Sequence, residues 1–184
     1  MRKLLAFSSL PTLMTIIHLT PKELPRYANE LRHFLRDVFD NPTMDIVCND
    51  ELLAYVVVLE SEQIVACSSV HVREMTQGET RFLGGVIGSV AVHPNWRGKG
   101  LCRSLIHALE TQMMASSVDV SFLFAYVPDI YRACGYQALE MPIHHVDDTT
   151  HTWTSFVYRG GMFKHLSQRI LLQDNEIDFG GCVY

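Results

Sequence analysis

The sequence predicts an α+β fold in which a mostly antiparallel, twisted mixed sheet carries one β–α–β unit and is flanked by helices. Two observations support this prediction. Apolar strand-like runs over residues 52–59, 64–72 and 80–93 follow one another with only short turns between them, as in an antiparallel meander. After residue 93 come a glycine-containing turn, a helical pattern and another buried strand, for which a right-handed parallel crossover is expected.

The first elements of the chain are a short strand and an amphipathic helix. Residues 15–19 are predicted to form the strand, and residues 21–38 the helix. Thr20 can cap this helix, and Pro21 suits its first position because proline lacks the N–H that would be unpaired there. Apolar residues recur every three or four positions along it and give one buried face: Leu24, Tyr27, Ala28, Leu31, Phe34, Leu35 and Val38.

The later elements begin with the helix of the β–α–β unit, which is predicted over residues 100–114. A buried strand over residues 120–126 completes that unit. Further strands are expected from about Met141 onward, with a turn at residues 147–149. The helix therefore packs on the sheet and begins at the strand ends.

The segment Arg97-Gly98-Lys99-Gly100-Leu101-Cys102 connects a strand to the start of a helix. Unpaired N–H groups and aligned peptide dipoles at a helix start favour anions, which indicates a phosphate-bearing ligand. A P-loop is excluded because Gly98-Lys99 is followed by Gly100 rather than by serine or threonine. A dinucleotide fingerprint is excluded because Arg103 occupies the place of its third glycine.

The same segment resembles the coenzyme A loop of the GCN5-related N-acetyltransferases (GNAT), Gln/Arg-x-x-Gly-x-Gly/Ala, although Cys102 replaces the last small residue. A second family motif, Tyr-x-x-x-Gly-Phe/Tyr, is matched by Tyr131, Gly135 and Tyr136 after the next strand. The resemblance covers roughly residues 50–140 and implies the GNAT fold, with acetyl-coenzyme A as co-substrate and an acyltransferase activity.

The resemblance also implies roles for individual residues. The strand residues Val90, Ala91 and Val92 would contact the coenzyme, with the amide of Val90 facing the oxyanion and that of Val92 holding the pantetheine arm. Residues 97–102 (Arg97, Gly98, Lys99, Gly100, Leu101 and Cys102) would bind the diphosphate. Tyr131 matches the family's tyrosine and would be the general acid for the leaving thiolate.

The general base stays open. Some relatives carry a glutamate two residues before the position of Val90, where this chain has Gly88. Water relays or an amine deprotonated in solution could replace it, and the side chains that could do so are His71, Glu74, His93 and His145. Cys134 is interpreted as a core residue, because the family usually transfers the acyl group directly.

The acceptor is predicted to be the primary amine of a small molecule. Residues 174–184 loosely resemble the end of the aminoglycoside 2′-N-acetyltransferase type, so Glu176, Asp178 and the Tyr184 carboxylate could contact a cationic acceptor. Two alternatives stay open: a protein or peptide N-acetyltransferase, and a non-catalytic sensor that binds acyl-coenzyme A. Gly88 and Cys102 would favour the sensor.

Composition places limits on the class of protein. The chain has 184 residues, of which 48% are hydrophobic and 19% charged, as expected for one globular domain. The formal net charge of −5 argues against a nucleic-acid partner. Five cysteines without a Cys-x-x-Cys pair predict no metal site and reduced thiols in a cytoplasmic protein.

The remaining expectations concern the domain boundaries, the membrane and the oligomeric state. Residues 1–13 are predicted to be an irregular extension, upstream of a natural start at Met14, and residues 14–184 a single N-acetyltransferase domain. No stretch reaches the ~18 apolar residues of a membrane span, so no membrane partner is expected. A homodimer is possible by resemblance to relatives that pair.

Overall fold

The computed structural model describes residues 14–147 and 149–183. Its first half consists of four strands, two short 3₁₀ turns and two long helices. In chain order these are β1 (Met14–Leu19), η1 (Leu24–Arg26), α1 (Ala28–Phe39), β2 (Leu52–Glu60), β3 (Gln63–Gln77), β4 (Thr80–Val92), η2 (Pro94–Trp96) and α2 (Leu101–Ala115). The second half contains β5 (Val120–Phe124), α3 (Asp129–Arg132), β6 (Gln137–Ala138), β7 (Ile143–Val146), β8 (Trp153–Phe156), β9 (Gly161–His165) and β10 (Ile177–Asp178).

The strands form one mixed sheet, in which the first four pair antiparallel in sequence order. β4 and β5 pair parallel across the α2 crossover, and β9 and β6 continue the sheet antiparallel beyond β5. The predicted α+β class, the meander and the β–α–β unit are confirmed.

Two element boundaries differ from the prediction. The first helix begins at Ala28 rather than at residue 21, because Pro25 lacks an N–H and disfavours the α conformation at the residue before it. Thr20 is not the N-cap of either element, since Glu23 holds that position in η1 and Tyr27 in α1, each without a side-chain cap. Its N–H and hydroxyl instead both donate to Glu23 Oε2, at 3.0 and 2.7 Å. The strand predicted over residues 120–126 ends at Phe124, and Tyr126 is fully exposed.

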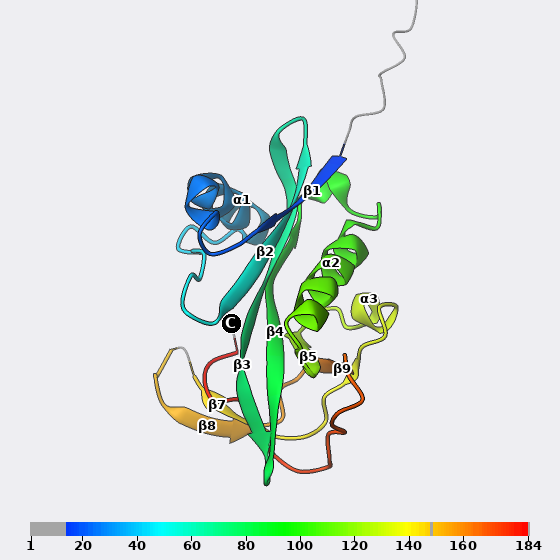
Figure 1. Ribbon diagram of the computed structural model, residues 1–184. Helices are drawn as coiled ribbons and strands as arrows, with labels where there is room; N and C mark the ends of the chain where they lie inside the picture. The colour runs from blue at the N-terminus through cyan, green and yellow to red at the C-terminus, as the bar shows by residue number, and fades with distance from the viewer. Residues whose placement is uncertain (1–13, 148, 184) are drawn as a thin grey trace, which may run out of the picture.

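The two long helices cover opposite faces of the sheet (Figure 1). The face under α2 has a core built from β2, β3 and β4 and from Leu105, Leu109 and Met113 of the helix. α2 lies very close to β4: a Cβ on Gly85 would be 2.4 Å from the Met113 sulfur, so a larger residue here would force the Met113 side chain to shift. On the other face, Leu31 and Leu35 of α1 pack against β2 and β3.

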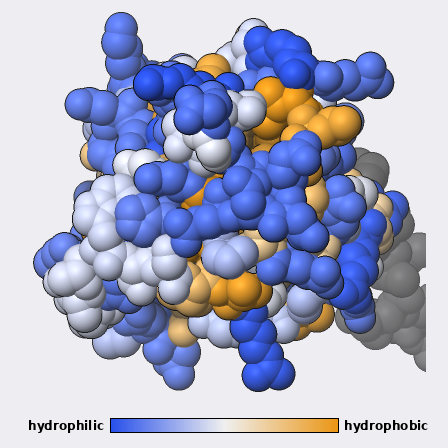
Figure 2. Space-filling model, turned by 90° about the horizontal axis from the view of Figure 1, so that it is seen from below, coloured by the Kyte–Doolittle hydropathy of each residue, from blue (hydrophilic) through white to orange (hydrophobic). Residues whose placement is uncertain are grey.

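At the lower end of the molecule, the spatial order of the strands departs from their order in the sequence. β10 lies between β3 and β7, antiparallel to the former and parallel to the latter, and β8 is the outermost strand there. Phe179, next to β10, is fully buried against Phe122. Figure 2 shows this end from below, where polar residues cover most of the surface and apolar ones appear in a few places.

No helix in the described part of the chain combines the length and apolar character required to cross a membrane.

Candidate functional site

The parallel pairing of β4 and β5 stops at Ile87 and Leu123. β4 nevertheless continues for five more residues, of which Gly88, Ala91 and Val92 pair with β3. In this second half of β4, one side of the strand is therefore open toward β5. Here lie Val90, Ala91 and Val92, the strand residues expected to contact the coenzyme.

A bulge marks the start of the open half of β4. Ser69 pairs with Gly88 and Cys67 with Ala91, so two residues of β4 lie opposite Ser68. Ser89, within the bulge, has a φ of +53°, which is rare for a residue with a side chain. Such a bulge re-aims the backbone that follows it.

The main chain of Val92 faces away from β3. The amide of His93 donates to Val65 O on β3 at 2.9 Å, and successive residues of a strand direct their backbone groups to opposite sides. Val92 therefore directs its N–H group toward the gap beside β5. Val90 lies in the bulge, which sets the orientation of its amide. The side chain of Arg97 agrees with this, because its Nε donates to Val92 O at 3.1 Å.

The loop after β4 ends at the start of α2. Gly98 and Gly100 have φ values of +75° and +80°, and a Cβ on either would meet no atom within 4 Å. The glycines are therefore required by backbone conformation, and the space beside them is open. No side chain caps α2, so its first N–H groups are available to an anion.

Charge near the loop also suits an anionic ligand. Lys99 Nζ lies 3.9 Å from the centre of the Trp96 ring, an arrangement that holds the ammonium close to the loop. Free main-chain amides, open space over two glycines and nearby cations together fit the diphosphate of coenzyme A.

Tyr131 on α3 lies next to the start of α2. Its hydroxyl interacts with the Cys102 thiol, and its ring is 6.5 Å from that of Tyr136. Burial, followed by the nearby Cys102 and Cys134, raises the pKa of Tyr131 well above its usual value. The phenol therefore stays protonated and can donate a proton.

The candidate bases lie at different distances from the bulge. His71 is nearest, because it lies on β3 two residues after Ser69, which pairs with Gly88. Burial lowers the pKa of His71 to about 4. Glu74 is exposed and pairs with Arg81, and His93 lies in the loop, where its Nδ1 accepts from Asn95 N. The buried His145 lies on β7 against Phe156.

The residues expected to bind the acceptor lie elsewhere. Asp178 pairs with Thr76, seven residues along β3 from Ser69, a separation of about 23 Å for an extended strand. Asp178 binds His144 Nδ1 at 3.2 Å, and Glu176 accepts from the Ser155 hydroxyl. Tyr184 lies outside the described residues. The structure thus brings Tyr131 to the loop but does not bring Glu176 and Asp178 there.

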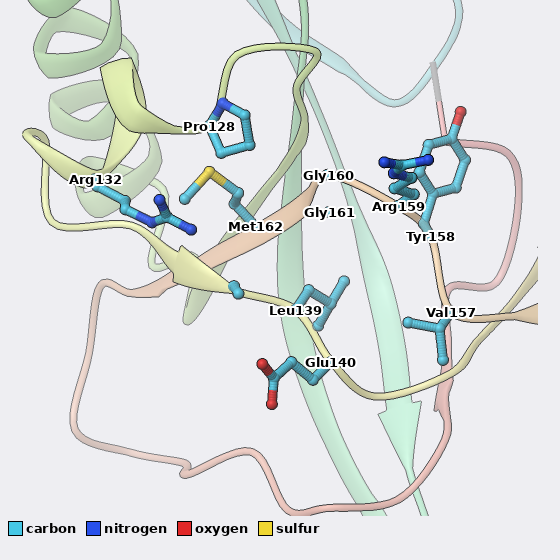
Figure 3. A pocket seen from close by; sticks show the side chains of 11 residues that line it. Pro128, Arg132, Leu139, Glu140, Val157, Tyr158, Arg159, Gly160, Gly161 and Met162 are labelled. Atoms are coloured by element: carbon cyan, nitrogen blue, oxygen red, sulfur yellow. The ribbon is translucent and has the colours of Figure 1, made fainter.

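A surface cavity of about 250 Å³ lies on the far side of β5 from β4. Pro128 and Arg132 border it on one side, and Tyr158 and Arg159 on the other (Figure 3). It adjoins α3, and β9 begins in its wall at Gly161.

Two residues of the site were missed by sequence reasoning. Ser89 forms the bulge, and the glycine before it was the only signal in the sequence that could have indicated a backbone irregularity there. Lys164 binds both α2 and the segment after α3, and no local pattern predicts a partnership over such separations in sequence.

Comparison with known proteins agrees with this architecture. The pattern of the acetyltransferase (GNAT) domain family matches residues 18–139. The chain therefore belongs to the GNAT acetyltransferase family. Comparison with curated protein sequences gives no match.

Several solved structures share the fold. The Escherichia coli GNAT family N-acetyltransferase YhbS, solved in complex with CoA, is 13% identical with a TM-score of 0.62, over 96% of this chain and 99% of that one. The aminoglycoside acetyltransferase meta-AAC0020 from an uncultured soil metagenomic sample, solved with sisomicin, is 22% identical with a TM-score of 0.52, over 66% and 84% of the two chains.

Some relatives are much longer than this chain. A GCN5-related N-acetyltransferase from Kribbella flavida is 16% identical with a TM-score of 0.54 over 68% of this chain. The match covers only 33% of that protein, and the same share of a similar protein from Enterococcus faecalis.

Proposed function

We propose that this chain is an acetyl-coenzyme A-dependent N-acetyltransferase that transfers the acetyl group directly to the primary amine of a small molecule. The observation that carries the proposal is the open half of β4, with the outward-facing amide of Val92, followed after a glycine-containing loop by the uncapped start of α2. Membership of the GNAT family supports it.

Each part of the site has a role in this proposal. The amides of Leu101 and Cys102, with the loop residues Arg97–Gly100, bind the diphosphate, and the amide of Val92 binds the pantetheine arm. The amide of Val90 donates to the oxyanion that forms when the thioester carbonyl is attacked. The coenzyme supplies an activated acetyl group as a thioester.

Proton transfers complete the reaction. The amine attacks as the free base, forms the C–N bond and loses its extra proton to water, since Gly88 provides no carboxylate. The C–S bond breaks, and Tyr131 donates its proton to the leaving sulfur. Tyr131 regains a proton from solvent. The net products are an amide and coenzyme A.

The test is an assay of thiol release. The protein is incubated with acetyl-coenzyme A and a panel of amines: an aminoglycoside, a polyamine, a phenylalkylamine and a lysine-containing peptide. Release with one or more small amines, but not with the peptide, supports the proposal. Release with the peptide alone would establish a peptide acetyltransferase. Coenzyme binding by calorimetry without release with any amine would indicate a sensor.

A further inference from the structure

The side chain of Lys164 on β9 links α2 to the segment that follows α3. Its Nζ donates to Glu110 Oε1 at 2.7 Å and to the main-chain carbonyl of Cys134 at 2.8 Å. The same ammonium lies 5.7 Å from the centre of the Tyr136 ring. The Glu110 side chain is only 8% exposed and that of Lys164 28%, so both charges are shielded from water.

This contact lies directly behind Tyr131. The amides of Cys134 and Tyr136 both donate to Tyr131 O, at 2.8 and 3.2 Å, which closes a tight turn. Gly135, within the turn, has a φ of +88°, and a Cβ there would be 3.4 Å from the Lys164 side chain. The lysine therefore lies against the turn that fixes the backbone of Tyr131.

α3 has little stability of its own. It is one turn of four residues, and no side chain caps it. Such a short helix depends on contacts with the rest of the protein. Two of its neighbours in the turn are held by groups outside it. Lys164 binds the carbonyl of Cys134, and the hydroxyl of Tyr136 forms a 2.7 Å hydrogen bond with that of Ser121.

We propose that Lys164, fixed by Glu110, is a positioning residue for Tyr131. This inference rests on the proposed function, in which Tyr131 donates the proton to the leaving sulfur. The ammonium ties the turn behind the phenol to the middle of α2, and the start of the same helix binds the diphosphate. The positions of the phenol and of the bound coenzyme are thus both set by α2. A misplacement of the phenol by about 1 Å can lower the rate ~10²-fold.

The first experiment is the substitution Lys164→Met, which keeps most of the stem and removes the ammonium. We expect kcat to fall about 10–100-fold, while the Kd for coenzyme A measured by calorimetry changes less than about threefold, because the loop is untouched. The matched control is Arg169→Met. Arg169 also joins separate segments, through Nε to Asp119 Oδ1 at 2.8 Å, but makes no contact near Tyr131, so its kcat should stay within about twofold of the wild type.

The decisive measurement is a double-mutant cycle with Tyr131→Phe. If Lys164 acts through the phenol, Lys164→Met lowers kcat strongly in the wild type and by less than about twofold in the Tyr131→Phe background. An equal loss of kcat in both backgrounds would overturn the proposal, since it would show a general structural effect.

Two further variants keep the test informative. If thermal melting shows that Lys164→Met does not fold, the same cycle is run with Glu110→Gln, which removes the charge that fixes the ammonium, and the same two outcomes decide. Lys164→Arg should recover less than half of the kcat lost in Lys164→Met, because a planar guanidinium cannot reproduce the contacts with both Glu110 and the Cys134 carbonyl. Full recovery would contradict the need for both contacts. If the wild type releases no thiol with any amine, the proposed function fails rather than this inference.

Discussion

The hydroxyl of Ser68 donates to the main-chain carbonyl of Gly88 over 3.0 Å, at the point where β4 leaves β5. Ser68 is completely buried, and Ser89 next to the acceptor carbonyl has a positive φ. The bond fixes the carbonyl before the bulge, and the orientation of the Val90 amide depends on that bulge.

Replacing Ser68 by alanine should therefore affect both stability and turnover. Loss of one buried hydrogen bond should lower the free energy of unfolding by about 1–2 kcal/mol, because the Gly88 carbonyl loses its partner. The kcat for thiol release should fall more than the coenzyme affinity, since the oxyanion donor is displaced. Thr111→Ala, which removes an exposed hydroxyl on α2, is the control for urea denaturation and for the assay. Equal kcat values for the two variants would contradict the role of the bulge.

The loop assignment can be tested with a matched pair, Gly100→Asn and Gly100→Asp. Both residues tolerate the left-handed conformation that a φ of +80° requires, and there is open space for either side chain. Only aspartate adds a negative charge facing the diphosphate. Coenzyme binding by calorimetry should be about tenfold weaker for Asp than for Asn at low salt, and the difference should shrink as salt screens the charge. Identical affinities would argue against diphosphate binding at this loop.

The pH profile should report on Tyr131. A free phenol loses its proton near pH 10, but burial raises the pKa of Tyr131 above that value. The wild-type kcat should therefore not decline up to about pH 10, and kcat/KM should rise with pH as the amine becomes the free base. Tyr131→Phe should lower kcat by about 10²–10⁴-fold at every pH and leave coenzyme binding nearly unchanged. A wild-type rate that falls between pH 8 and 9 would show that a different group supplies the proton.

Stability should decrease in mild acid because of His71. Its pKa is lowered by burial from 6.5 to about 4 in the folded state, so the unfolded chain takes up a proton first. The contribution of His71 is complete above pH 6.5 and is lost as the pH falls toward 4, with a slope of at most about 1.4 kcal/mol per pH unit. His71→Asn should flatten this part of the stability curve, measured by urea denaturation, whereas substitution of the exposed His107 should not. An unchanged slope in His71→Asn would refute the assignment.

Much of the fold could be predicted because its signals are local. Strand-forming runs separated by short turns, and one glycine-containing loop before a helix, define the first four strands and the β4–α2–β5 unit. The prediction for the start of α1 was wrong because Thr20 and Pro21 form a valid helix start by themselves, whereas Pro25 interrupts the segment and α1 begins only at Ala28. The place of β10 could not be predicted, since two residues carry no periodic pattern and their partner on β3 lies about a hundred positions away.

The site shows the same division between local and distant signals. The loop residues and Tyr131 were found from two short motifs, and the structure places both at the start of α2. Glu176 and Asp178 were chosen from their charge and from a loose resemblance of residues 174–184 to the end of the aminoglycoside 2′-N-acetyltransferase type, neither of which indicates where the segment folds. They lie beside β7 and β8, bound to His144 and Ser155. Their contact with an acceptor stays a prediction.

The intercalated position of β10 also has a consequence for the order of assembly. β7 and β8 are separated from β3 by this strand, so the hairpin that they form can arise early from neighbours in sequence but cannot dock alone. Docking requires residues 177–181 to be threaded alongside β7, where Val146 N donates to Gly181 O and Phe179 N to His144 O. Because this step closes a very long loop between β3 and β10, we expect it to be among the slowest in folding. A protease cut just before β10 would then sever from the chain the strand that joins β7 to β3, and the β7–β8 hairpin would depend on that fragment for its place in the sheet.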